Sequence, residues 1–242
     1  TWSNLKKNFL KPVTISLIGG AVLFPLLPLS NRSEIYTYIA FILCIFVLSS
    51  MLIEFFKGTM ARHDLHEETA IGALGSLIWH NKRRYGGYIV HIGVVMIYAG
   101  IAASQSYGTH TEKRVKIGDT IEIRDYMLRY EKLAAVQATS VKTRIIAQLA
   151  VEKDGKRIWT ARPEKEFYKG QNQPVSEVDV RSTLASDLYV ILADFSEDES
   201  ATIKVYHNPM VKWLWTGGWV IALGTMITAW PDRLEQRRRL ER

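Results

Sequence analysis

The sequence contains a single cysteine, Cys44, which lies in the middle of an apolar run. Residues 106–210 contain no cysteine, which excludes a disulfide, a Cys-x-x-Cys redox motif and a cysteine-based metal site in that segment. The zinc-enzyme motif His-Glu-x-x-His is absent from the whole chain. Residues 106–210 also show no grouping of nucleophile, base and acid, and their carboxylates are typical of surface charge.

Charge is also missing from four stretches of the chain, which contain no Asp, Glu, Lys or Arg. These stretches are residues 12–31, 35–53, 85–111 and 213–231. Each is close to the roughly 20 residues that a helix needs to cross a hydrocarbon core about 30 Å thick. The pattern predicts a membrane α-helical protein with four transmembrane helices.

Proline and glycine occupy specific places in these stretches. Pro25 and Pro28 stand near the end of the first and predict a kinked helix, because neighbouring helices can satisfy the carbonyls that proline frees. Gly217, Gly218 and Gly224 in the fourth predict close packing against another helix.

The lysines and arginines outside these stretches indicate an orientation. They gather before the first stretch, between the second and third, and after the fourth, whereas the first two are joined only by SNRSE. Lys and Arg mark the cytoplasmic side, so residues 106–210 are predicted on the opposite side. This topology accounts for the net charge of +7, and no basic recognition helix indicates binding to nucleic acid.

Residues 106–210 have the pattern of short strands. Apolar runs flank Asp154-Gly155, which is a strong signal for a β-hairpin. Five or six strands with polar turns predict one small all-β domain, a sandwich or barrel, inserted between helices 3 and 4. The predicted division is as follows: two transmembrane helices in 1–56, a cytoplasmic loop with an amphipathic helix in 57–84, the third helix in 85–105, the periplasmic β domain in 106–210, the fourth helix in 211–231 and a basic cytoplasmic tail in 232–242.

Two histidines in the cytoplasmic loop form the first candidate site. His63 and His66 are three residues apart and share a helical face with Glu67. A metal site is conceivable there, but ordinary surface positions are the simpler interpretation of these residues.

His91 is the second candidate, because it lies about six residues, or roughly 9 Å, into the third stretch. Ionisable residues at such depth usually face a bundle interior and mark function. Gly87, Val94, Val95 and Tyr98 share its face. Such small and β-branched neighbours suit an axial haem ligand, because the flat macrocycle must lie against the helix. A hydrogen bond to a neighbouring helix is the structural alternative.

The other histidines lie outside the predicted spans. His63, His66 and His80 fall in the cytoplasmic loop, whereas His110 and His207 lie at the outer face. If His91 binds haem with two histidine ligands, the second must therefore come from outside this chain.

Four stretches of the sequence together resemble the C-terminal third of the CcmF family of cytochrome c maturation proteins. They are RRYGGYIVHIGVVMIYAGIA, KIGDTIEIRDYMLRYEKL, SEVDVRSTLASDLYVIL and YHNPMVKWLWTGGWVIALG. They agree with the family in order, spacing and membrane topology. The resemblance extends over residues 80 to 230.

This resemblance implies a role in the covalent attachment of haem to apocytochrome c by a haem lyase, or holocytochrome c synthase. It implies a haem b held by two histidines from different helices, and His91 matches one of them. The haem b reduces the iron of the incoming haem, with quinol as the expected electron donor. The implied partners are the haem chaperone CcmE, CcmH-type and CcmI-type subunits, and apocytochrome c. The implied location is the bacterial inner membrane, with the β domain in the periplasm.

Several family features are absent from this sequence. The tryptophan-rich segment, its two flanking periplasmic histidines and the other membrane histidine are missing, and neither His110 nor His207 matches those positions. The chain alone is therefore not expected to be catalytically complete. An N-terminal part of the same protein, or a companion subunit, would carry these features.

Two other functions remain open from the sequence. The chain could be a non-catalytic assembly module whose β domain docks partner subunits or apocytochrome c, with His91 as a packing residue. It could also be half of a transporter, although runs of intramembrane charge and discontinuous helices are lacking.

Overall fold

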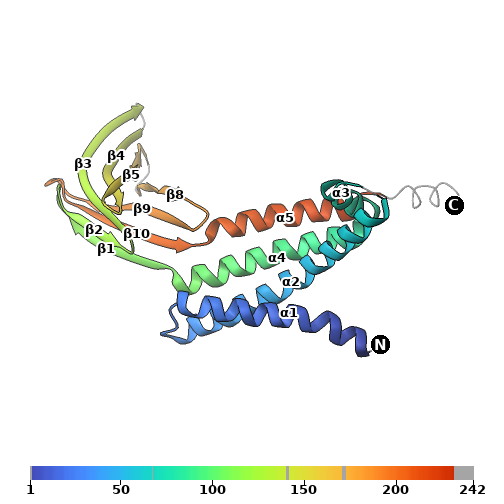
Figure 1. The fold of residues 1–242 in the computed structure, drawn as a ribbon. Coiled ribbons are helices and arrows are strands. Elements are labelled where there is room, and N and C mark those ends of the chain that lie inside the picture. Colours follow the sequence, from blue (N-terminus) through green and yellow to red (C-terminus); the bar gives the residue numbers. More distant parts are fainter. Residues whose placement is uncertain (1, 67, 140–141, 171–172, 232–242) are drawn as a thin grey trace. The chain divides into compact units, whose positions relative to one another are not determined.

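The computed structural model describes residues 2–66, 68–139, 142–170 and 173–231. The chain divides into a helical unit, which ends at Ser106 and resumes at Trp213, and a β unit over Tyr107–Lys212 (Figure 1). This arrangement confirms that a β domain is inserted between apolar helices. The predicted basic tail, 232–242, lies outside the described residues.

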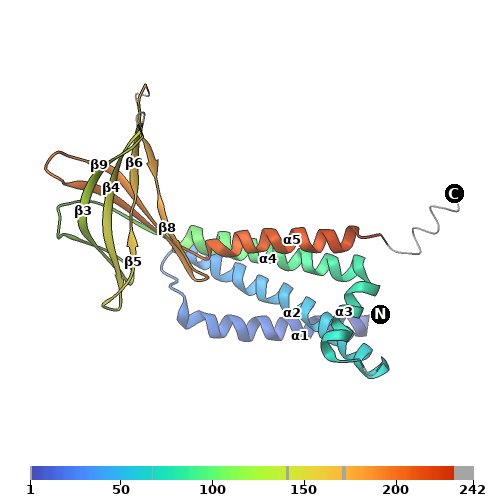
Figure 2. The ribbon, with the colours of Figure 1, turned by 90° about the horizontal axis from the view of Figure 1, so that it is seen from above.

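In the part of the helical unit that the structure describes, four longer helices run alongside one another and are accompanied by one short α-helix (Figures 1 and 2). They are α1 (Trp2–Leu23), α2 (Arg32–His66), α3 (Ala70–His80), α4 (Lys82–Tyr107) and α5 (Val211–Ala229). Among the described helices, three segments are long and apolar enough to cross a membrane: Asn8–Leu26, Arg32–Leu65 and Lys82–Tyr107. The 19-residue α5 is not one of them, so a count of four spans stays a prediction.

The first helix ends at its prolines, so the predicted kink is wrong. After Leu23 the chain tightens into the 3₁₀ helix η1 (Phe24–Leu26), with Pro25 in its first turn. Leu27 is extended, with φ −111° and ψ 132°. Pro28 explains this conformation, because a proline disfavours helical geometry in the residue before it.

The segment predicted as a cytoplasmic loop is mostly helical. α2 continues to His66, well past its apolar run. Thr69 then caps α3, its hydroxyl oxygen accepting the backbone N–H of Gly72 at 3.2 Å. Such a cap satisfies a donor that the first helical turn leaves free.

In its described residues the β unit contains ten strands in two antiparallel sheets, more than the five or six predicted. One sheet has the order β1 (Thr109–Val115), β10 (Ala201–Pro209), β9 (Ser186–Phe195) and β8 (Asp179–Ser182). The other has the order β2 (Thr120–Ile123), β3 (Tyr126–Thr139), β4 (Lys142–Lys153), β6 (Glu164–Tyr168) and β7 (Val175–Glu177), with β5 (Lys156–Ala161) also paired to β4.

The two sheets enclose one apolar core. Leu128 and Leu149 contribute from one sheet, and Val190 and Val205 from the other. Burying a side chain of this kind stabilises a fold by about 1.5–3 kcal/mol. The core therefore holds the domain together without a disulfide, as the absence of cysteine requires.

The predicted hairpin at Asp154-Gly155 is confirmed. These two residues join β4 to β5, and Lys153 is opposite Lys156 in the register. Both turn residues have positive φ, 51° and 71°. A two-residue turn of this type demands that conformation, which Asp and Gly adopt more readily than most residues.

Candidate functional site

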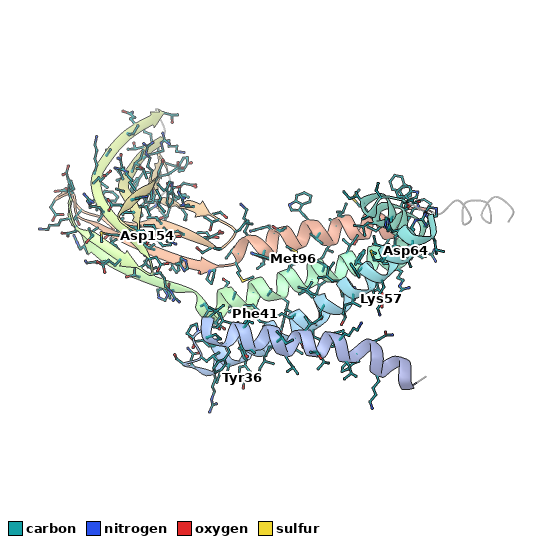
Figure 3. All side chains as sticks on the ribbon, in the orientation of Figure 1. Tyr36, Phe41, Lys57, Asp64, Met96 and Asp154 are labelled. Atoms are coloured by element: carbon teal, nitrogen blue, oxygen red, sulfur yellow. The ribbon has the colours of Figure 1, made fainter. Side chains whose placement is uncertain are left out.

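His91 lies in an apolar groove between α4 and α2. Val94, Val95 and Tyr98 continue its face of α4, as the helical spacing predicts. α2 supplies the other wall with Leu43, Cys44 and Val47, and the groove has a volume of about 280 Å³. Figure 3 shows the side chains of these helices, with Phe41 on α2 and Met96 on α4 labelled.

The imidazole of His91 is exposed and has a defined orientation. Its Nδ1 atom lies 2.8 Å from the carbonyl oxygen of Gly87, one turn earlier. A neutral imidazole protonated at Nδ1 donates this hydrogen bond and keeps its lone pair on Nε2. Nε2 has no hydrogen-bond partner among the described residues. The free lone pair is the feature that an iron or another electrophile requires.

Gly87 leaves open space beside the imidazole. A Cβ atom built on it would meet no heavy atom within 4 Å. The predicted absence of bulk at this position is therefore confirmed. Its carbonyl orients His91, and its missing side chain leaves that side of the ring clear.

The composition of the groove limits what it can bind. Within the described residues, no group of three His, Cys, Asp or Glu side chains could hold a bare metal ion. One imidazole stands beside apolar side chains, of which Val94 is 49 % exposed and Tyr98 52 % exposed. This combination suits a flat, apolar group that takes a single nitrogen ligand from this chain.

α5 packs on the face of α4 that lies away from His91. Gly86 and Gly93 of α4 meet Gly224 and Gly217 of α5 at backbone contact distance. Because successive helical residues are about 100° apart, these glycines lie roughly 140° to 200° around α4 from His91. The contact confirms the packing role predicted for Gly217 and Gly224, whereas a Cβ on Gly218 would meet nothing within 4 Å.

Polar contacts fix α2 against α4 at both ends of the groove. At one end the hydroxyl of Thr37 lies 2.6 Å from that of Ser106. At the other end Arg84 pairs with Glu54 at 2.5 Å. Glu54 thus ties the two helices together.

The second histidine site is only partly visible. Nδ1 of His63 contacts the carbonyl oxygen of Glu68, and the side chain of Glu68 pairs with Arg62 at 3.2 Å. The side chain of His66 and the whole of Glu67 lie outside the described residues. The metal site suggested for His63 and His66 therefore stays a hypothesis.

The two outer histidines lie on neighbouring strands but do not come together. In the register His110 is opposite Tyr206, on which its ring stacks with centroids 5.6 Å apart. His207 is the next residue along β10 and points to the other face of the sheet. Burial lowers the pKa of His207, and Arg124 and Lys153 lower it further. The imidazole of His207 is therefore mostly neutral at pH 7.

The β unit matches a known family. Residues 106–209 match the CcmF C-terminal beta-sandwich. The CcmF cytochrome c-type biogenesis protein of Escherichia coli strain K12 is 28% identical over 153 residues, 63% of this chain and 24% of that protein. The CcmF protein of Pseudomonas aeruginosa is 27% identical over 192 residues, 79% of this chain and 28% of that protein. The chain thus spans about a quarter of the length of these curated relatives.

The helices also have a counterpart among solved structures. The structure of a cytochrome c heme lyase CcmF matches 92% of this chain and 34% of its own, with a TM-score of 0.68 and 19% identity. At this identity the likeness shows the fold alone. It extends over helices and β-sandwich together.

Proposed function

We propose that this chain is the C-terminal portion of a CcmF-type cytochrome c biogenesis protein, and that His91 is an axial ligand of a haem b within a haem lyase. The proposed overall reaction is covalent attachment of haem to apocytochrome c. When bound, haem b would supply a one-electron couple for reducing the iron of the haem that is attached.

The orientation of the His91 imidazole carries this proposal. Gly87 holds the Nδ1 proton, so Nε2 stays available as a ligand. This second hydrogen bond is the usual device that fixes the tautomer of a ligating histidine and raises its basicity. Val94, Tyr98 and Leu43 provide the apolar wall that keeps water from the ligand.

The rest of the proposed site lies outside this chain. Among the described residues the groove contains one histidine, so a second ligand would come from an N-terminal part or a companion subunit, which would also carry the tryptophan-rich segment. The proposed partners are CcmE, CcmH-type and CcmI-type subunits and apocytochrome c, with quinol as electron donor. The proposed location is the bacterial inner membrane, with residues 106–210 in the periplasm.

A reduced-minus-oxidised optical spectrum of the purified membrane complex tests the proposal. His91→Ala should remove or shift the b-type bands at equal protein. His80→Ala is the matched control, because His80 is also helical and its Nδ1 lies 2.8 Å from the carbonyl oxygen of Ser76. Bands that stay unchanged in the His91 variant would contradict the proposal.

An assembly module is the second candidate function, and exposed apolar side chains of the β unit favour it. Val175, Val178, Val180 and Leu184 are each 39–69 % exposed along β7, β8 and their flanking turns. Such a group on a folded domain is typical of a protein interface. Charged substitutions there should then release partner subunits in a pull-down while the haem spectrum of the complex stays unchanged.

A further inference from the structure

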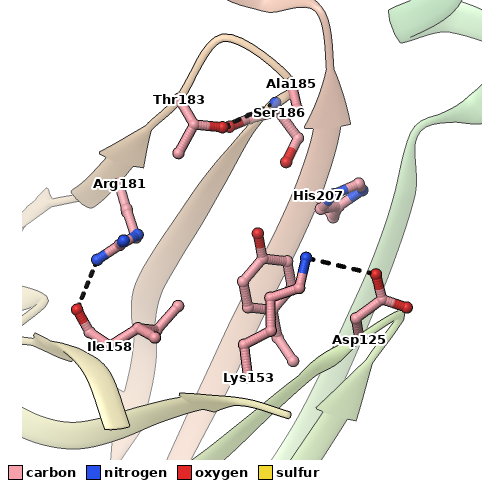
Figure 4. A pocket seen from close by; sticks show the side chains of 9 residues that line it. Asp125, Lys153, Ile158, Arg181, Thr183, Ala185, Ser186 and His207 are labelled. Atoms are coloured by element: carbon pink, nitrogen blue, oxygen red, sulfur yellow. Dashed lines mark hydrogen bonds and ion pairs between the residues drawn. The ribbon is translucent and has the colours of Figure 1, made fainter. Parts of the chain in front are cut away.

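The β unit contains a polar pocket that is separate from the His91 groove (Figure 4). Its volume is about 410 Å³, within the range of roughly 300–1,000 Å³ typical of small-ligand sites. Its lining includes Lys153 and Arg181, the imidazole of His207, and apolar surface from Tyr126 and Ile158.

Three nitrogen groups in this pocket have unused hydrogen-bonding capacity. Nδ1 of His207 is buried and has no hydrogen-bond partner among the described residues. Nη1 of Arg181 donates a hydrogen bond to the carbonyl oxygen of Ile158 at 2.6 Å. This bond fixes the guanidinium in the wall of the pocket. Its other N–H groups have no partner within the described residues. A buried polar atom without a partner costs free energy, and the unused N–H groups of Arg181 can donate to a ligand.

Lys153 brings a second positive charge to the pocket. Its ammonium lies 5.2 Å from the centre of the Tyr126 ring and 3.6 Å from the Asp125 carboxylate, which is too far for a hydrogen bond. The side chain of Asp125 is 72 % exposed, so water weakens its hold on the lysine. Lys153 is therefore available to an anion.

The charges that line the pocket favour a ligand group that carries a single negative charge. Two cations and one carboxylate line the pocket, which leaves one net positive charge for an anionic ligand. A guanidinium fork matches the two oxygens of a carboxylate in geometry. The ring of Tyr126 and the side chain of Ile158 offer apolar surface to the hydrocarbon that bears this group.

From this geometry we propose that the pocket between Arg181, Lys153 and His207 binds a carboxylate on an apolar carrier. Arg181 and Lys153 hold the two oxygens, and the His207 imidazole donates a further hydrogen bond. Two sources have this chemistry, namely a porphyrin propionate and an acidic peptide side chain. The site does not depend on His91, so it can be tested when that residue is absent.

The test uses the full chain with His91→Ala, so that the membrane groove contributes no haem ligand. One arm titrates ferric protoporphyrin IX against its dimethyl ester, and the other titrates acetyl-Gly-Glu-Gly-Glu-Gly-amide against its glutamine counterpart. The free carboxylate of at least one pair should bind at least tenfold more tightly than its neutral form. A preference in the porphyrin arm identifies a propionate, a preference in the peptide arm identifies an acidic segment, and a preference in both identifies a carboxylate site open to either source.

Paired variants connect the binding to the pocket. Arg181→Gln and Lys153→Gln should each weaken the preferred probe at least tenfold. Arg162→Gln and Lys156→Gln are matched controls, because these exposed side chains make the same charge change outside the pocket, and they should alter binding less than twofold. Lys153→Gln is decisive if Arg181→Gln unfolds, since the Lys153 side chain donates no hydrogen bond to the other sheet within the described residues. The proposal is overturned if the acidic and neutral forms of both probes bind equally tightly. It is also overturned if Lys153→Gln leaves the binding of the preferred probe unchanged.

Discussion

Gly93 and Gly217 approach each other so closely that a Cβ atom on either would lie 2.6 Å from the carbonyl oxygen of the other. Gly217→Ala should therefore push α5 away from α4. Overpacking of this kind usually costs about 1–3 kcal/mol. Thermal unfolding of the full chain in detergent should show the loss as a lower midpoint.

The neighbouring glycine provides the control for this experiment. A Cβ on Gly218 would meet no atom within 4 Å, and alanine favours a helix over glycine by up to about 1 kcal/mol. Gly218→Ala should thus leave the midpoint unchanged or raise it. Equal destabilisation by both substitutions would show that the helices do not pack through Gly217.

The open space at Gly87 leads to a prediction that separates folding from ligand binding. Gly87→Leu should fold normally, because the new side chain would begin in unoccupied space. It should nevertheless fill the side of the His91 ring that the proposed haem needs. We expect unchanged thermal stability with weakened b-type absorption bands in the purified complex, whereas Gly87→Ala should retain most of the absorption. Full haem content in the leucine variant would argue against a macrocycle on this face.

Glu166 makes the stability of the β unit depend on pH. Lys142, 2.5 Å away, and the Tyr168 hydroxyl, which donates at 2.7 Å, lower the pKa of this carboxyl below its ordinary value of 4.5. A carboxyl with a depressed pKa in the folded state contributes stability that is fully present above its unfolded value and is lost as pH falls through the folded value. The contribution should therefore disappear progressively below about pH 4.5.

Denaturant unfolding at pH 7 and pH 3 tests this dependence. Glu166→Gln should destabilise the β unit at pH 7 and have little effect at pH 3, where the native carboxyl is being protonated. Glu122→Gln serves as the control, because Glu122 is an exposed residue of the edge strand β2. A Glu166 effect of the same size at both pH values would exclude the ionised pair as its source.

Features of the helical unit that depend on one helix alone could be predicted from the sequence. His91, Val94, Val95 and Tyr98 lie on one face because 3.6 residues per turn place them there. The opposite wall could not be predicted, because Cys44 reaches the groove only through the packing of α2 on α4. The end of α1 at Leu23 could not be predicted, since one proline can either kink or end a helix, and here Pro28, which follows Pro25, favours ending it.

The β unit shows the same limit. The Asp-Gly turn was predictable because its chemistry is local. The number of strands was underestimated because short strands such as β7 and β8 carry too few residues to show alternation. The pocket around His207 was missed for a related reason. Lys153 pairs with Tyr126 in the register of β4 and β3, and His207 comes from the facing sheet, so only the folded domain brings them together.

The strand that follows α4 and the strand that precedes α5 are also paired with each other. α4 leads into β1, β10 leads into α5, and β1 and β10 are hydrogen-bonded neighbours. The polypeptide thus enters and leaves the β unit through two strands that are paired with each other. Domains whose ends meet in this way tolerate exchange and circular permutation. The rest of the β unit could therefore lengthen, shrink or be replaced during evolution without separating α4 from α5.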